Sequence, residues 1–162
     1  MSKIEFRTAS SADLEYVANN LRDADVEELV VSSGRRPPEA FDERAKVSVD
    51  VQCGVVDGRP ACIFGVYPHD GVGSPWFMGT EDIESVAVAR AMRVYGKGLF
   101  EKWADEYGTL RSWVYDKNTF RKEFFESMGA TMDDITLEIG LQKAPMRRFT
   151  FVRTDRFKLH RE

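Results

Sequence analysis

PWFMGT at residues 75–80 and LRSWVY at residues 110–115 are the two segments that decide the fold of this chain. Each is short and mostly apolar, which is typical of a buried strand. A helical pattern lies between them, and two strands joined by a crossover helix must run parallel, with a right-handed connection favoured. We therefore expect a strand–helix–strand unit at the centre of an α/β domain.

The segment between the two strands has one apolar stripe at helical spacing. Its members are Val88, Met92, Tyr95, Leu99 and Trp103. The stripe predicts a single helix from about residue 85 to residue 107. Gly96 and Gly98 oppose this helix, because glycine in a helix interior costs about 1 kcal/mol relative to alanine. In the alternative, a strand ends near Val88, a loop runs through Gly98, and a shorter helix begins there.

The chain before this unit predicts a strand, helices and a hairpin. In order, we expect a strand at 3–8, a helix capped by Ser10 or Ser11, a helix at 23–31, one or two helical turns in 39–49, and strands at 51–56 and 60–67. Asp57-Gly58 joins the last two strands and is a strong hairpin signal. Residues 69–74 are expected to form a loop.

A two-residue turn at Asp57-Gly58 would set the register of this hairpin. It places Cys53 opposite Cys62 on one face of the sheet, where a disulfide is geometrically possible. Two buried free thiols are the favoured interpretation, because disulfides are rare in cytosolic proteins.

The segment after residue 115 predicts a helix followed by paired strands. Asn118 is a good cap for the helix, and Gly129 supplies its left-handed exit. We expect a strand to begin at 130–132, an extra strand or loop at 136–142, and a final strand at 148–153.

The composition fits one soluble domain over residues 1–162, with 43% hydrophobic residues. No apolar run approaches the ~20 residues of a membrane span, and the start lacks the apolar core of a signal peptide, so we expect a cytoplasmic protein. The net charge of −4 argues against general nucleic-acid binding, although residues 146–162 form a basic C-terminal strand and tail. Two cysteines and two histidines without zinc-ligand spacing predict no metal site.

The order of the expected elements resembles the GNAT superfamily of acyl-CoA N-acyltransferases. The residues that carry the likeness are 75–80, 110–115 and the helix between Asn118 and Gly129. The resemblance implies a mixed, mostly antiparallel sheet with flanking helices. In that fold a central parallel strand pair splays apart and holds the pantetheine arm of acetyl-CoA or another acyl-CoA.

The resemblance also implies a set of cofactor-binding candidates. The superfamily's diphosphate loop usually reads Arg or Gln, two residues, Gly, one residue, Gly or Ala, and residues 93–98 match it. Glycines let backbone amides approach a diphosphate at a helix start, but a continuous helix would leave those amides bonded internally. The competing interpretations are that Phe77 is a ring of the hydrophobic core and that Arg93 and Lys97 lie on a solvated helix face. The candidates are Phe77, Met78, Gly79, Arg93, Gly96, Lys97, Gly98 and Asn118.

Acyl transfer to an amine needs a base for the amine proton and often an acid for the leaving thiolate. In many GNAT enzymes the acid is a tyrosine seven residues after the Asn that opens the last helix. Counting from Asn118 gives Phe125, which cannot donate a proton. Tyr115 is the candidate replacement, although strand tyrosines are more often packed. Glu81 and Asp82 are candidate bases, with a helix-capping role as the competing interpretation.

A closer resemblance covers about the C-terminal half of the chain. PWFMGT, a long helix, and WVYDKNT followed by an aromatic helix are similar to small GNAT-like proteins of short-tailed phages, which are linked to the internal core of the virion and its assembly. That resemblance implies one charged helix without a glycine loop, phage structural proteins as partners, and a location in the host cytoplasm or the virion. Transferase activity is not implied by it.

Two functions are therefore predicted. The favoured one is a phage-encoded GNAT-like protein with a virion assembly or protein-contact role and a degenerate acyl-CoA site. The alternative is an active acyl-CoA-dependent N-acyltransferase that acts on a small amine or a protein lysine. Neither function predicts membrane binding. Nucleic acid is a candidate partner only through the basic tail, whose alternation of charge and aromatics also fits an amphipathic strand.

Overall fold

The computed structural model describes residues 2–153 of the chain. In order, its elements are β1 (Ile4–Thr8), α1 (Ser11–Asn19), α2 (Asp23–Ser33), α3 (Pro37–Val47), β2 (Asp50–Val56), β3 (Arg59–His69), β4 (Val72–Gly79), the 3-10 helix η1 (Glu81–Glu84), α4 (Val86–Tyr107), β5 (Thr109–Tyr115), α5 (Thr119–Ser127), β6 (Thr131–Ile139) and β7 (Ala144–Val152). Ser10 caps α1 with a reciprocal capping box. The expected helices at 23–31 and 39–49 correspond to α2 and α3.

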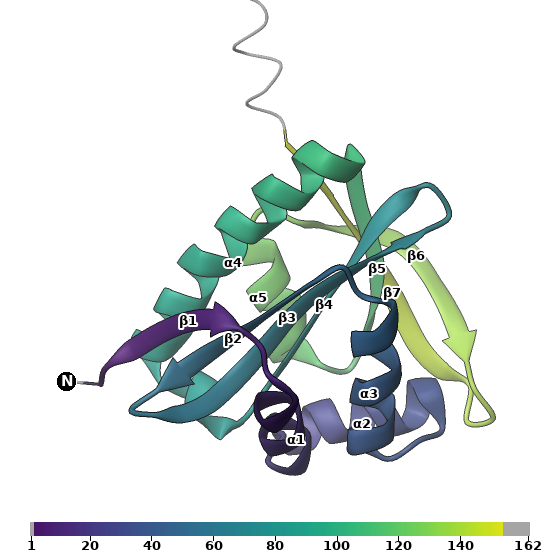
Figure 1. Cartoon of the computed structure of the whole chain (residues 1–162). Helices are drawn as coiled ribbons and strands as arrows, with labels where there is room; N and C mark the ends of the chain where they lie inside the picture. The colour runs from purple at the N-terminus through teal and green to yellow at the C-terminus, as the bar shows by residue number, and fades with distance from the viewer. Residues whose placement is uncertain (1, 154–162) are drawn as a thin grey trace, which may run out of the picture.

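Within residues 2–153, one mixed sheet joins seven strands in the order β1-β2-β3-β4-β5-β7-β6. Neighbouring strands are antiparallel except β4 and β5, which are parallel (Figure 1). The expected strand–helix–strand unit is confirmed, since α4 connects these two parallel strands. The mixed, mostly antiparallel sheet with a central parallel pair is therefore the observed fold class.

The hairpin of β2 and β3 has the expected turn but a different register. Asp57 (φ 50°) and Gly58 (φ 80°) form the two-residue turn. A β-bulge beside Gly54 shifts the pairing by one residue, so that Cys62 lies opposite Gly54 rather than opposite Cys53. The expected register, with Cys53 opposite Cys62, is wrong, and the favoured interpretation of two buried free thiols is confirmed. Both cysteines are buried and free, in the cores on opposite faces of the sheet.

A second tight hairpin replaces the expected loop at residues 69–74. β3 continues to His69, and β4 begins at Val72. Asp70 (φ 50°) and Gly71 (φ 79°) make a two-residue turn with both residues in the left-handed region. The expectation was wrong because Asp-Gly carries the same hairpin signal here as it does between β2 and β3.

Helix α4 is continuous through both of its glycines, as the apolar stripe predicts. A Cβ at Gly96 would lie 2.4 Å from Met128 Sδ and 2.8 Å from the ring of Phe64. Close packing of α4 on α5 and β3 therefore requires glycine at this position. The alternative with a loop through Gly98 is wrong.

Helix α5 begins and ends where the sequence predicts. Asn118 caps it, and Gly129 (φ 106°) follows its end. β6 then runs as one strand with an irregularity in its middle. The expected strand at 130–132 and the expected strand or loop at 136–142 are thus parts of β6 and of the turn that follows it.

Strand β7 begins earlier than the expected strand at 148–153. It pairs with β5 on one side and with β6 on the other, and the pairing with β6 extends back to Ala144. β7 contains the first part of the basic segment 146–162. Residues 154–162, where the basic tail was expected, lie outside the described residues.

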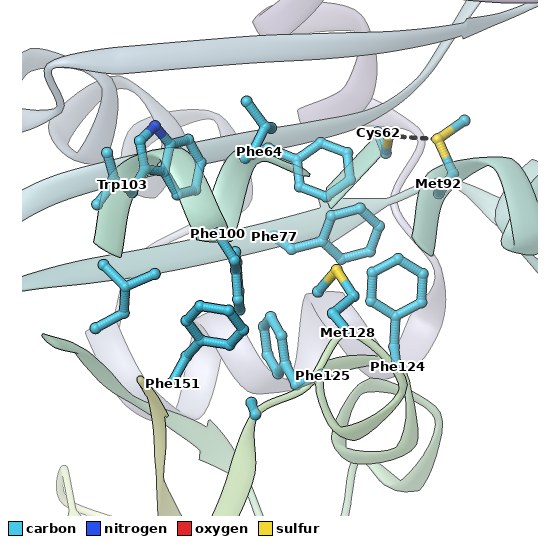
Figure 2. Close-up of a cluster of buried hydrophobic side chains, with 14 of the residues drawn as sticks. Cys62, Phe64, Phe77, Met92, Phe100, Trp103, Phe124, Phe125, Met128 and Phe151 are labelled. Carbon is cyan, nitrogen blue, oxygen red and sulfur yellow. Dashed lines mark hydrogen bonds between the residues drawn. The ribbon is translucent and has the colours of Figure 1, made fainter. Parts of the chain in front are cut away.

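Within residues 2–153, two large hydrophobic cores and one small cluster, which is formed by Tyr115, Ala144 and Met146, pack on the sheet. The two large cores lie on opposite faces. The larger core packs α4 and α5 against the strands, and Figure 2 shows its crowded aromatic rings. Among them, the ring centroids of Phe77 and Phe124 are 4.5 Å apart. The second core packs α1, α3 and Leu29 of α2 against the other face. Over the part of the chain that the structure describes, no helix has the length and apolarity that crossing a membrane requires.

Candidate functional site

The parallel strands β4 and β5 separate after a single bridge. Gly73 of β4 pairs with Leu110 of β5, and no other β4–β5 pair forms among the described residues. On the side facing away from β5, β4 pairs with β3 as far as Gly79. On the side facing away from β4, β5 pairs with β7 as far as Tyr115. At the diverging edges, backbone amides need hydrogen-bond partners from elsewhere.

Helix α2 supplies those partners through two carboxylates. The Gly79 amide donates to Asp25 Oδ2 at 3.0 Å, and the Tyr115 amide donates to Glu28 Oε1 at 2.8 Å. Asp25 and Glu28 are three residues apart, so they share one face of the helix. Their side chains are only 1% and 3% exposed. One helix face thus closes the gap between the two strand ends.

Positively charged and amide side chains surround the two carboxylates. Arg121 Nη2 lies 2.8 Å from Asp25 Oδ1, and Arg121 Nη1 contacts Glu28 Oε2. Asn118 Nδ2 and Arg22 Nη1 also donate to Asp25 Oδ1, at 3.1 and 3.2 Å. These five residues, Arg22, Asp25, Glu28, Asn118 and Arg121, are called the buried ion network below.

The buried ion network is electrostatically costly. Burial raises the pKa of the Glu28 carboxyl, and the positive charge of Arg121 offsets only part of that effect. The Nε atoms of Arg22 and Arg121 have no hydrogen-bond partner within residues 2–153. Because desolvation of charges can cancel the attraction between them, such a network contributes little net stability. Its clearest effect is to fix α2 against the two strands.

Four of the candidates from the sequence meet at this network. Asn118 belongs to it, Gly79 and Tyr115 donate to it through their backbone amides, and Met78 Sδ lies 2.7 Å from one of the Arg121 guanidinium nitrogens. The Tyr115 hydroxyl donates to the Glu27 carboxylate of α2, which lies outside the network, at 3.2 Å. Burial, and then this carboxylate, raise the pKa of Tyr115, so the phenol stays protonated at neutral pH.

Phe77 and Phe125 belong to the large core rather than to the gap (Figure 2). The ring of Phe77 lies 4.7 Å from that of Phe64, and Phe125 stacks on Phe149 with centroids 4.3 Å apart. Phe77 is thus packed in the large core, and its contact with a cofactor stays a prediction. The position of the usual GNAT tyrosine holds a packed ring.

Glu81 and Asp82 lie in η1, directly after β4. Asp82 pairs with Arg59 at 3.4 Å, while Glu81 is exposed. The Asp82 amide donates to the Thr80 hydroxyl, so Thr80 caps η1. The two acids line a cavity of about 370 Å³, together with Tyr16, Asn20, Leu21, Arg59 and Thr80. This cavity is polar and lies beside the end of β4.

Arg93, Gly96, Lys97 and Gly98 do not form a loop. They lie in the middle of α4, where backbone amides are bonded within the helix. Only the side chains of Arg93 and Lys97 are available to a phosphate. The N-terminus of α4, where the helix dipole favours an anion, directly follows the acidic helix η1.

Four members of the buried ion network are missing from the sequence predictions: Arg22, Asp25, Glu28 and Arg121. One signal was present in the sequence. Arg121 precedes Phe124 and Phe125 by three and four residues, so it lies on the buried face of an aromatic helix. An arginine there needs an anionic partner, and the two nearest in space are far away in sequence.

No protein-family model matches the sequence, and no curated protein matches it. Solved structures do match. A ribosomal-protein-alanine N-acetyltransferase from Brucella melitensis is similar with a TM-score of 0.68 at 14% identity, over 92% of this chain and 99% of that chain. A GNAT-family acetyltransferase from Bacillus anthracis gives 0.66 at 8% identity, over 93% and 95%. A putative acetyltransferase from Salmonella typhimurium, solved with its cofactor acetyl-CoA, gives 0.62 at 12% identity, over 92% and 93%.

These likenesses define the class of fold. The chain has the GNAT fold, with a parallel β4–β5 pair inside a largely antiparallel sheet. The three structures named above are acetyltransferases, and at such low identities the likeness concerns the fold alone. The comparisons give no support to the resemblance to phage core proteins.

Proposed function

We propose that this chain is an acyl-CoA-dependent N-acyltransferase, with acyl-CoA bound in the β4–β5 gap and a small amine or a protein lysine as the acceptor. The observation that supports the proposal is the divergence of β4 and β5 beyond the Gly73–Leu110 bridge in a GNAT fold. It leaves the Gly79 and Tyr115 amides outside the strand ladder. Such amides are donors of the kind that the carbonyls of a pantetheine arm need.

The proposed reaction forms a nitrogen–carbon bond and breaks the carbon–sulfur bond of the thioester. One proton leaves the amine and one reaches the thiolate. Tyr115 is the proposed donor to the thiolate, because it ends β5 beside the gap and a phenol carries its proton at neutral pH. Glu81 is the proposed base, because it is exposed in the cavity after β4 while Asp82 is held by Arg59.

The diphosphate end of the ligand fits less well. The acidic residues of η1 precede the start of α4 and oppose an anion there. Arg93 and Lys97 offer side-chain contacts from the middle of the same helix. We therefore propose that affinity comes mainly from the strand gap, with Arg93 contacting the diphosphate.

A thermal titration with acetyl-CoA tests the proposal. A ligand that binds the folded state stabilises it by about 2.7 kcal/mol at a hundredfold excess over the dissociation constant. We expect a rise in melting temperature that Arg93→Glu reduces and that Arg36→Glu preserves, because Arg36 is an exposed arginine before α3, on the opposite face of the sheet. Mass spectrometry should then detect the acylated amine. No rise at millimolar acetyl-CoA would refute the proposal.

A second candidate is a protein-contact role without acyl transfer, which includes the virion assembly role that the phage resemblance implies. Two observations favour it. Asp25 and Glu28 already accept hydrogen bonds from the amides at the ends of β4 and β5. Phe125, a packed ring, stands at the position of the tyrosine acid of many GNAT enzymes. This candidate predicts no stabilisation by acetyl-CoA, even after Glu28→Gln. Recovery of the chain in purified virus particles would support the virion role.

A further inference from the structure

We infer that α2 is a displaceable plug for the gap between β4 and β5. Asp25 and Glu28 come from one helix face, and each accepts the amide of a different strand, Gly79 of β4 and Tyr115 of β5. The two carboxylates therefore hold the acceptor positions that a ligand with amide carbonyls would need. Movement of α2 frees both donors at once. The inference rests on the proposed function only for the identity of the ligand that enters.

Helix α2 is attached by polar contacts and by few fully buried apolar side chains. Its buried residues are Asp25, Glu28 and Leu29, and the half-buried Val26 and Val31 pack against neighbouring hydrophobic clusters. Full burial of one side chain such as Leu29 is worth about 1.5–3 kcal/mol. Val30, on the same helix, is 40% exposed. Segments with few buried apolar contacts open at lower free energy than the core does.

Opening of the plug returns charged groups to water. Burial raises the pKa of Glu28, which means that the closed state disfavours its charged form. Arg22 and Arg121 each leave a buried Nε without a hydrogen-bond partner in residues 2–153. Hydration of these groups in the open state offsets much of the loss of the ion pairs. The ion pairs thus define where α2 sits in the closed state but contribute little to the free energy of opening.

Both ends of α2 contact the sheet. Before α2, the Arg22 amide donates to the Gly79 carbonyl at 3.0 Å. Near its C-terminal end, the Val31 carbonyl lies against Gly140 of the β6–β7 turn, where an added Cβ would come within 2.6 Å of it. Because Asp25 lies in the first turn of α2, beside the N-terminal contact, we expect both amides to become free only when α2 moves away from the strands as a whole.

Thiol labelling tests the plug without any ligand. Met78 on β4 is 0% exposed and touches Arg121 of the network, so Met78→Cys places a thiol behind α2. Cys53 and Cys62 are also 0% exposed in the same sheet and report opening of the whole fold. We expect the thiol at position 78 to react with a water-soluble disulfide reagent ~10-fold faster than the two native thiols do.

Two further substitutions sharpen the labelling experiment. Glu28→Gln removes one charge of the plug and should speed labelling at position 78 by another ~10-fold, with no change at the native cysteines. Asp23→Asn is the matched control, because Asp23 is an exposed acid of the same helix; it should change nothing. Equal rates at all three thiols, or an equal rise at all three in Glu28→Gln, would overturn the inference.

Hydrogen exchange on the unaltered protein gives a second measurement, in case Met78→Cys does not fold. We expect the amides of α2 to exchange through an opening of lower free energy than those of β3, which lies in the middle of the sheet. Equal protection of the two elements would contradict a plug that opens separately from the sheet.

Acetyl-CoA separates this inference from the proposed function. If both hold, Glu28→Gln binds acetyl-CoA about tenfold more tightly than the unaltered chain does, because a larger fraction of molecules is open. Fast labelling at position 78 without acetyl-CoA binding would support the plug and refute acyl-CoA as the ligand. Acetyl-CoA binding with no change in the exchange of α2 would refute the plug and leave acyl transfer standing.

Discussion

Gly96 and Gly98 illustrate how the surroundings of a residue decide its role. The two glycines are two positions apart in α4, as in a diphosphate loop, but both lie inside a continuous helix. Gly96 is buried against Met128 and Phe64, whereas an added Cβ at Gly98 would meet nothing within 4 Å. The first glycine is therefore explained by close packing, and nothing in the structure explains the second.

Substitution of these two glycines by alanine should have opposite effects on stability. Gly96→Ala places a methyl group against a buried ring and should destabilise the fold by about 1–3 kcal/mol. Gly98→Ala should stabilise it by up to about 1 kcal/mol, because alanine is the better helix former. Urea unfolding of the two variants measures both values. A stabilising Gly96→Ala would contradict the packing described here.

Phe125→Tyr should not restore an acid to the gap. Phe125 is 2% exposed and stacks on Phe149, so the added hydroxyl enters an apolar core. A buried hydroxyl without a partner costs about 1–3 kcal/mol. We expect lower stability in denaturant and no gain in acyl transfer, whereas Tyr115→Phe, which keeps the ring, should lower any transfer rate. A higher transfer rate in Phe125→Tyr than in the unaltered chain would mean that position 125 faces the ligand.

At the scale of elements, Asn118 joins three parts of the molecule. Its Oδ1 accepts the Arg121 amide in the first turn of α5, and its Nδ2 donates to Asp25 of α2. It is 2% exposed and lies three residues after Tyr115, where β5 ends. One side chain thus starts a helix and contributes to the network that holds α2 against the strands.

Replacement of Asn118 should separate its two roles. Asn118→Ala removes the cap and the bond to Asp25, while Asn118→Ser keeps a capping oxygen and removes only that bond. Loss of a helix cap costs about 1 kcal/mol, and loss of a buried bond to a charged group costs about 1.5–3 kcal/mol. We expect chemical denaturation to rank the chains as unaltered, then Ser, then Ala. Equal stability of Ser and Ala would show that capping contributes nothing here.

At the scale of the whole molecule, carboxylates with lowered pKa values connect distant elements. In Asp13, Asp50 and Asp133 burial alone would raise the pKa, and hydrogen bonds from neighbouring donors outweigh it. In Asp116, a hydrogen bond from Arg147 has the largest effect and one from Lys122 the next largest, and both lower the pKa. Their contacts connect α1 to β1, β2 to α4, the β5–α5 turn to β7, and β6 to β7.

Acid should therefore weaken the whole fold. For these aspartates the folded pKa lies below the ordinary value of 3.8, so the unfolded state binds protons first. Their contribution is present above that pH and is lost as the pH falls through 3.8 and below. Glu28 has the opposite sign, because its pKa is raised above the ordinary 4.5 and its protonation favours the folded state.

Unfolding free energies measured from pH 7 to pH 3 check this prediction. We expect a decline that is steepest below about pH 4 and shallower in Asp116→Asn, which removes one of the titrating groups. Glu28→Gln should remove the opposing contribution above pH 4.5 and leave the acid limb unchanged. A profile that is flat down to pH 3 would contradict the lowered pKa values.

The sequence by itself determined the features that depend on local pattern. The apolar stripe of α4, the Asn118 cap and the turn at Asp57-Gly58 each involve residues within a few positions of one another, and all three are present in the structure. The order of these elements was enough to predict the parallel β4–β5 pair and the GNAT fold.

Only the tertiary structure decided the pairing of Cys62 with Gly54 and the closure of the gap between β4 and β5. A bulge of one residue leaves no trace in the hydrophobic alternation of the neighbouring strand. Asp25 meets the Gly79 amide from 54 residues away, and Glu28 meets the Tyr115 amide from 87 residues away. Periodicity and capping act over one or two turns, whereas the choice of such partners follows from how complete elements pack.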